Sequence, residues 1–124
     1  MIRGVRGAIT VKQDNESEII LATERLLMQM IKENNINPDD VASVFISVTD
    51  DVTAAFPAKA VRSLEGWTYV PVMCMKEISV TNSLTNCIRV MMHVNTTKVQ
   101  HEINHIYLEG AEVLRPDLNP TNHH

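Results

Sequence analysis

The sequence contains few of the residues on which many functional sites depend. Its 124 residues include two cysteines, Cys74 and Cys87, which match no metal-ligand spacing and are too few for a disulfide scaffold. There is no Gly-rich phosphate loop, metal-ligand cluster or nucleophile elbow. His101 and His105 could hold a metal if they share a helix face, but ordinary surface histidines fit better. We therefore expect neither a metal nor a cofactor.

Charge and hydropathy argue against two further classes of protein. The net charge is −4 and the isoelectric point is about 5.7, whereas a nucleic-acid-binding protein carries a basic patch. No apolar run approaches the roughly 18 residues that a membrane span requires. Residues 1–6 lack the apolar core of a signal peptide. We therefore expect a cytoplasmic protein with no nucleic-acid or membrane partner.

The length predicts one domain and a site that depends on other copies of the chain. A chain of this size buries only about two-thirds of the surface that it exposes when unfolded, which leaves little depth for an enclosed pocket. Small-molecule sites are then often built between subunits, so we expect an oligomer. We assign one domain to residues 1–118 and a mobile tail to residues 119–124, whose last two histidines could be a purification-tag remnant.

Apolar periodicity predicts an α+β fold. The clearest element is a helix over 15–34, with Asn15 as N-cap and Glu18 in the capping-box position. Residues 86–96 alternate strictly, which places aliphatic side chains on one face of a strand and Arg89 on the other. The other expected elements are strands at 2–12 (with a bulge), 43–49, 67–72 and 111–114, and short helices at 57–64 and 99–108. We expect a single mixed sheet packed with the long helix and the short ones.

The arginines are the most informative residues. Arg89 lies in the middle of an apolar strand, where a guanidinium needs an anionic partner or a water-filled site, since an unpaired buried charge is very costly. A structural ion pair with Glu77 and a ligand-binding role are equally consistent with this position. Arg6 raises the same question, although an exposed sheet edge is the simpler explanation there. Several arginines in an acidic protein favour a site for a small polyanion such as a dicarboxylate.

Separated segments, in the same order along the chain, resemble one known family. These segments are residues 2–8, 56–62, 67–72, 74–77, 87–92, 107–109 and 113–118. Each alone is a weak signal, but together they closely resemble the monofunctional chorismate mutases of the Bacillus type over roughly residues 1–118. The resemblance implies conversion of chorismate to prephenate without metal or cofactor. It also implies a homotrimer with a pseudo-α/β-barrel at its centre and active sites in clefts between subunits.

The resemblance assigns roles to individual residues. Arg89 would hold the breaking ether oxygen and a carboxylate of the substrate. Arg6 would bind the carboxylate of the enolpyruvyl arm, with Tyr107 beside it. Glu77 and the backbone or thiol of Cys74 would take the ring hydroxyl. Each assignment has a plainer alternative: a loop carboxylate for Glu77, a packing residue for Cys74 and a core residue for Tyr107.

The resemblance also implies an apolar wall and a charged entrance to the site. The wall would comprise Phe56, Ala58 and Leu114, and the entrance would comprise Lys59, Arg62 and Arg115. A solvated rim is an equally good explanation for Lys59 and Arg62. Met73 departs from the family pattern, which has threonine at this position. The change is harmless if the position contributes only backbone to the substrate site, whereas a side-chain contact would be lost.

Two other functions are compatible with such a fold. Small trimeric imine deaminases share the implied architecture and use an interfacial arginine to bind a carboxylate, but their sequence signatures are absent here. A catalytically silent trimer that senses an aromatic-pathway metabolite is the second alternative. The presence of both Arg89 and Glu77 argues against a sensor, which does not need a cation at the ether oxygen.

Overall fold

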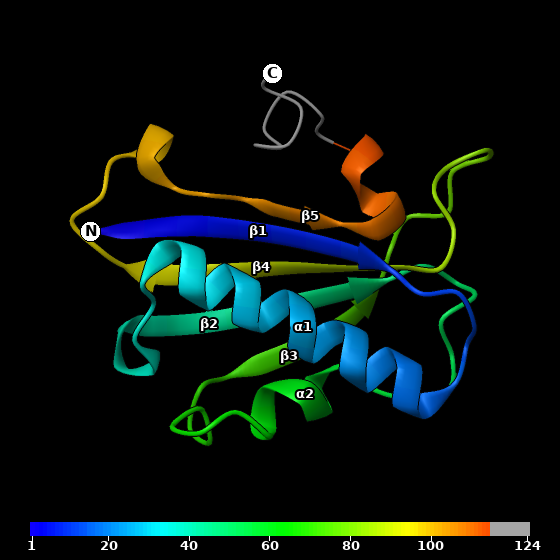
Figure 1. Ribbon diagram of the computed structural model, residues 1–124, viewed down its shortest axis with the longest axis horizontal. Helices are drawn as coiled ribbons and strands as arrows, with labels where there is room; N and C mark the ends of the chain where they lie inside the picture. Colours follow the sequence, from blue (N-terminus) through cyan, green and yellow to red (C-terminus); the bar gives the residue numbers. More distant parts are fainter. Residues whose placement is uncertain (115–124) are drawn as a thin grey trace.

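The computed structural model describes residues 1–114, which form a single mixed β-sheet with two α-helices (Figure 1). The strands are β1 (Ile2–Thr10), β2 (Val41–Val48), β3 (Val72–Lys76), β4 (Cys87–Asn95) and β5 (Ile106–Leu108). The helices are α1 (Glu16–Asn34) and α2 (Ala58–Arg62), and three 3-10 turns are η1 (Pro38–Asp40), η2 (Gln100–Glu102) and η3 (Glu109–Val113). The expected mixed sheet with one long helix is confirmed. The predictions for Arg115 and for the tail at 119–124 lie outside the described residues.

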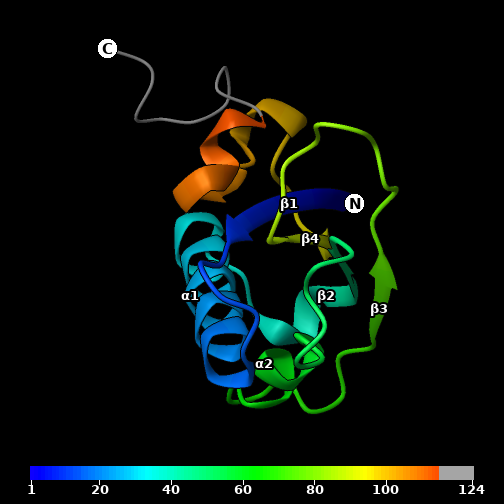
Figure 2. The same ribbon diagram turned by 90° about the vertical axis from the view of Figure 1, so that its right-hand side faces the viewer.

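The sheet has the strand order β3-β2-β4-β1-β5. The central strand β4 is antiparallel to both β2 and β1, whereas the edge strands β3 and β5 are parallel to their neighbours. Figure 2 shows α1 on one side of the strands, and α2 packs beside α1 and against β3. None of the helices in residues 1–114 is both long and apolar enough to cross a membrane.

The long helix α1 begins where the sequence predicts. The Asn15 side chain accepts a hydrogen bond from the Glu18 amide at 2.8 Å, which satisfies one of the free amides of the first turn. The Glu18 carboxylate accepts from the amide of Lys12, before the cap, and not from Asn15 itself. It therefore fixes the chain that leads out of β1. The helix ends at Asn34, and the left-handed backbone of Asn35 (φ 51°) caps its last turn.

The core lies between α1 and one face of the sheet. The alternation predicted for β4 is confirmed, since its aliphatic side chains are buried under α1 while Arg89 lies on the opposite face. We call this opposite face the open face and define it by Arg6, Ser47, Arg89 and Met91. At one end of the open face a smaller buried cluster forms under η3 from Ala8, Cys87, Tyr107 and Ala111, with Leu84 and Leu114 beside it.

Two expectations for the first half of the fold are wrong. Strand β1 pairs with β4 without interruption from Ile2 to Thr10, so it has no bulge, and the irregularity in the register lies in β2 instead. In the strand expected at 67–72, residues 67–71 form a turn and only Val72 belongs to a strand, β3. Gly66 has a positive φ of 86°, and Trp67 is 3% exposed because its ring packs into the core from this turn.

Two expectations for the last part of the chain are also wrong. Residues 99–108 contain the turn η2 and the strand β5 in place of one helix, because 106–108 pair with β1. Residues 111–114 lie in or beside η3 and do not form a strand. Glu109 has a positive φ of 54°, which turns the chain at the end of β5, and the Gly110 amide then donates to the Thr10 hydroxyl at 2.9 Å.

Candidate active site

The register of the sheet places a row of side chains across the open face. Arg89 on β4 lies opposite Ser47 on β2 and Ala8 on β1, and Ala8 in turn lies opposite Tyr107 on β5. Directly paired residues project to the same face of a sheet, so these four side chains are neighbours.

A second row lies beside the first and completes a cavity. Met91 on β4 pairs with Arg6 on β1 and with Phe45 on β2. The cavity has a volume of about 290 Å³. It is lined by Arg6, Phe45, Ser47, Met75, Glu77, Arg89, Val90 and Met91. The structure thus brings together three of the predicted residues, two arginines and a glutamate, at one open cavity.

Arg89 and Glu77 form an ion pair at the floor of this cavity. The Arg89 Nε atom lies 3.2 Å from Oε2 of Glu77, and the two side chains are 29% and 26% exposed. Ser47 donates its hydroxyl hydrogen to the same Oε2 atom at 2.9 Å. A guanidinium has five N–H donors, so this one pair leaves most of them for a ligand. The structure thus contains the ion pair, one of the two alternatives left by the sequence, and also places Arg89 at the cavity.

Two buried polar atoms at this site have no hydrogen-bond partner within residues 1–114. They are Nε of Arg89, whose contact with Glu77 is not aligned as a hydrogen bond, and the hydroxyl of Tyr107. Buried polar groups are nearly always paired in native proteins, so the Tyr107 hydroxyl is expected to find a partner outside residues 1–114. Beside them, burial raises the pKa of the Cys87 thiol, and the nearby Arg89 guanidinium only partly opposes this effect. Cys87 is thus a neutral packing group at neutral pH.

The predicted residues around α2 lie elsewhere. Ala58 is buried, whereas Phe56 is 71% exposed and Arg62 is also exposed. Lys59 forms an ion pair with Glu16 at the start of α1, at 3.2 Å. The helix α2 contacts α1 and β3 on the side of the sheet opposite the open face. One chain therefore does not bring these side chains to Arg89.

Cys74 and Met73 lie on the edge strand β3. Cys74 pairs with Ile46, so its side chain points toward the main core and not toward the open face. The Pro71 carbonyl and the Glu77 amide bond to β2. Since alternate residues of a parallel strand face the same neighbour, the amide and carbonyl of Cys74 point outward at the free edge. The backbone of Cys74 is therefore better placed for a ligand than its thiol.

The remaining site predictions have mixed outcomes. Leu114 packs against the small cluster that contains Tyr107, while Arg115 lies outside the described residues. The sequence reasoning missed Ser47, Phe45 and Met91, which line the cavity. The alternation of β4 already places Met91 on the face of Arg89, but only the pairing of the strands shows that Ser47 and Phe45 lie opposite these two residues.

His105 has a structural contact that the sequence did not suggest. Its Nδ1 atom accepts a hydrogen bond from the Arg6 amide at 2.9 Å, next to the cavity. Residues 101 and 105 lie in a 3-10 turn and in the chain before β5, not on one helix.

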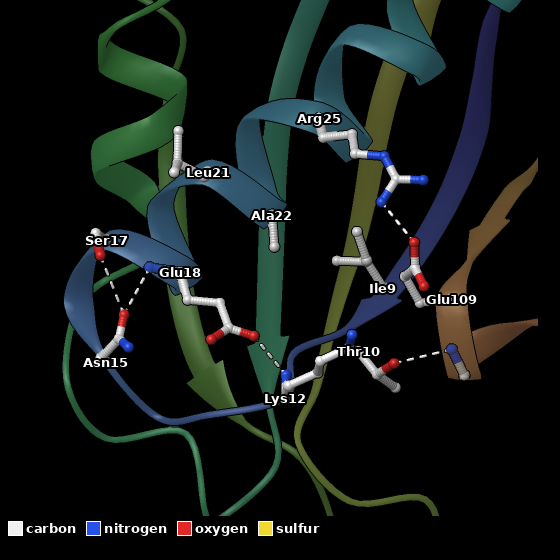
Figure 3. A pocket seen from close by; sticks show the side chains of 11 residues that line it. Ile9, Thr10, Lys12, Asn15, Ser17, Glu18, Leu21, Ala22, Arg25 and Glu109 are labelled. Carbon is white, nitrogen blue, oxygen red and sulfur yellow. Dashed lines mark hydrogen bonds and ion pairs between the residues drawn. The ribbon is translucent and has the colours of Figure 1, made fainter.

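A larger cavity, of about 650 Å³, lies between the end of β1, the start of α1 and η3. Figure 3 shows that Arg25 and Glu109 point toward each other across it, with Nη1 and Oε1 2.6 Å apart. This pairing lowers the pKa of Glu109. None of the residues predicted for the site lines this cavity, and its opposite charges already neutralise each other.

The fold and the cavity define a small α+β protein in which two arginines and a glutamate line an open face of the sheet. Comparison with known proteins identifies the family. The chain belongs to the chorismate mutase type I family, whose model matches residues 2–118. The resemblance stated from the sequence is thereby confirmed.

Individual relatives agree with this family. The chain is 55% identical to the chorismate mutase AroH of Bacillus subtilis (strain 168) over 121 residues, which cover 98% of this chain and 95% of that protein. It is 44% identical to the chorismate mutase AroH of Thermus thermophilus over 119 residues, covering 95% and 97%. A solved chorismate mutase from Clostridium thermocellum superposes with a TM-score of 0.87 at 49% identity, covering 90% of this chain and 98% of that one. The imine deaminase and the silent sensor are not favoured.

Proposed function

We propose that the cavity on the open face is where this chain converts chorismate to prephenate, a step in the synthesis of phenylalanine and tyrosine. The observation that carries the proposal is the convergence of Arg6, Arg89 and Glu77 on one open cavity. The two guanidinium groups can bind a ligand with negatively charged oxygens. Chorismate carries two carboxylates and an ether oxygen.

The chemistry requires positioning and charge in place of a nucleophile. In this intramolecular Claisen rearrangement, a flexible dianion must fold into a chair-like conformer before its C–O bond breaks. Electron density then builds on the ether oxygen, where a fixed cation stabilises the transition state more than the ground state. No proton transfer and no bound metal is needed for this reaction.

The described side chains can perform these tasks. In the proposed arrangement, Arg89 donates to the ether oxygen and to a carboxylate, while Arg6 and Tyr107 bind the carboxylate of the enolpyruvyl arm. Glu77 accepts from the ring hydroxyl and stabilises partial positive charge on the ring. Its ion pair with Arg89 holds the guanidinium in place before the substrate arrives, so little reorganisation is needed during the reaction.

We further propose that the site is completed by a second copy of the chain in a trimer, with the sheets arranged around a central pseudo-barrel. In one chain Phe56 is exposed and the backbone of Cys74 points outward at the free edge of β3, so both are available to a substrate bound at a neighbouring chain. Lys59 and Arg62 would then line the entrance of the neighbour's cavity. Met73 is 61% exposed on β3, where it pairs with Phe45 of the open face. Its backbone bonds β2, which leaves only its side chain for a neighbour or a substrate.

We also propose that the protein works in the cytoplasm, where its two free thiols would stay reduced. Cys74 and Cys87 are unbridged in the structure, which is compatible with this setting.

The direct test is the loss of chorismate absorbance with purified protein and no added metal or cofactor. We expect rapid formation of prephenate by the wild-type chain and almost none by an Arg89→Ala control. A folded wild-type protein that binds chorismate without converting it would contradict the proposal and favour the sensor.

A complementation experiment tests the shared site. Arg89→Ala and a Lys59→Ala/Arg62→Ala double variant should each have low activity as homotrimers. When the two are unfolded together and refolded, about a quarter of the sites should combine intact residues from both, because each site draws one half from each of two neighbouring subunits. Sedimentation velocity should show a trimer in every sample. A mixture no more active than its parents would show that each site lies within one chain.

A further inference from the structure

We propose that Ser47 is a positioning residue of this site. Its hydroxyl group holds one oxygen of the Glu77 carboxylate against Arg89, and thereby leaves the other oxygen for the ring hydroxyl of the substrate. The inference rests on the proposed function and adds to it a residue that neither the sequence motifs nor the charge pattern suggested.

The two oxygens of Glu77 have different surroundings. Oε2 accepts the hydrogen bond from Ser47 at 2.9 Å and lies 3.2 Å from Nε of Arg89. Oε1 accepts only a long contact of 3.3 Å, from the amide of Ile78, among the described residues. The carboxylate is therefore bound on one side and available on the other. A ligand hydroxyl in the cavity would meet the oxygen that still has acceptor capacity.

The sheet leaves little freedom in where Ser47 lies. Ser47 is the direct cross-strand partner of Arg89, so both side chains rise from adjacent points on the open face. Glu77 comes immediately after β3, and its amide donates to the Val48 carbonyl at 2.7 Å. Glu77 thus reaches the site from the β3 side of β2, whereas Arg89 reaches it from the β4 side. Serine is small enough at this point to leave the cavity open above it.

The Ser47 hydroxyl fixes the orientation of the Glu77 carboxylate, which Arg89 alone does not fix. The contact between Nε of Arg89 and Glu77 is an ion pair without the alignment of a hydrogen bond, so it attracts the carboxylate but does not fix its orientation. Glu77 is about one-quarter exposed and its terminal torsion is intrinsically soft. The hydrogen bond from Ser47 to this charged acceptor fixes the orientation of the carboxylate. Ser47 therefore acts through Glu77 and does not need to touch the substrate.

The test is a double-mutant cycle in the trimeric enzyme with chorismate as the substrate. Ser47→Ala should lower kcat about 10-fold, the effect expected for one hydrogen bond to a charged group, with a smaller change in KM. In a Glu77→Ala background the same substitution should change kcat by less than about 2-fold, because the group on which Ser47 acts is already absent. A merely structural role for the serine would give the same loss in both backgrounds.

Ser43→Ala is the matched control. Ser43 lies on the same strand, and its hydroxyl contacts His93 at 3.0 Å in place of Glu77. We expect this variant to keep wild-type kcat. If Ser47→Ala keeps wild-type kcat, or if its loss is fully additive with that of Glu77→Ala, the positioning role is overturned while the enzyme function stands. A wild-type chain that does not convert chorismate would overturn the proposed function itself, together with the role of Ser47.

Discussion

Arg89 and Glu77 lie on opposite sides of β2 in the sheet, and their side chains meet over Ser47 with Nε and Oε2 3.2 Å apart. The pair explains how an arginine is tolerated in the middle of the central strand, since the carboxylate offsets the cost of removing the guanidinium from water. It also holds that guanidinium at the edge of a cavity. One contact therefore serves both folding and the proposed catalysis.

Replacement of Arg89 by lysine should separate these two roles. Lysine keeps a positive charge that can pair with Glu77, so we expect the melting temperature to change by only a few degrees. It cannot reproduce the two-pronged grip of a guanidinium on the ether oxygen and a carboxylate, so kcat should fall at least about 100-fold. Steady-state kinetics and thermal melts of the same preparation measure both effects. A near-normal kcat would remove Arg89 from the mechanism.

Elements with a strong local signal could be predicted from the sequence. The cap at Asn15 and the alternation in β4 are properties of neighbouring residues, and both are confirmed. The turn at Trp67 and the strand β5 could not be predicted, because tertiary contacts decide them. Trp67 is buried because it packs into the core from its turn, and residues 106–108 form a strand because they pair with β1.

The same distinction applies to the site. Arg89 could be singled out because a charge in an apolar strand is unusual by itself. Ser47 could not, since a serine in a strand is ordinary and its importance arises from the residues opposite it. The separation of Arg62 from Arg89 likewise depends on which face of the sheet α2 covers, which a single sequence does not specify.

A side chain at position 7 should destabilise the protein, because the space around Gly7 is filled by α1. A Cβ atom at this position would lie 2.5 Å from Sδ of Met30 and 3.0 Å from Cδ1 of Leu26, both fully buried on α1. We expect Gly7→Ala to lower the free energy of unfolding by about 1–3 kcal/mol through overpacking, as measured by urea denaturation. Gly4→Ala is the control, because its Cβ would meet only the half-buried Met91 at 3.1 Å. Equal losses in the two variants would argue against close packing of α1 on Gly7.

Cys87 should resist alkylation in the folded protein. Its side chain is fully buried, and burial raises the pKa of the thiol despite the opposing charge of Arg89. Because the thiolate is the reactive form, iodoacetamide at neutral pH should leave Cys87 unmodified in the native protein and modify it in urea. Mass spectrometry of peptides reads out each cysteine separately. Rapid modification of native Cys87 would show that the cluster under η3 opens readily.

Asp14 should stabilise the protein in a manner that depends on pH. Its carboxylate accepts hydrogen bonds from the hydroxyl and the amide of Thr53 and from the amide of Ala54, and so ties the loop before α2 to the start of α1. These bonds, that of the Thr53 hydroxyl above all, lower the pKa of Asp14 below its ordinary value of 3.8. The charged form is therefore favoured by folding.

The sign of the effect follows from this lowered pKa. The unfolded chain binds a proton at Asp14 more readily than the folded chain, so the contribution is fully present well above pH 3.8 and is lost as the pH falls through the folded-state pKa. We expect Asp14→Ala to melt at a lower temperature than the wild type near neutral pH, and the gap to narrow steadily in acid. Melting curves at a series of pH values measure that gap. If the gap in melting temperature between the two proteins is the same at every pH, the charge of Asp14 contributes nothing to stability.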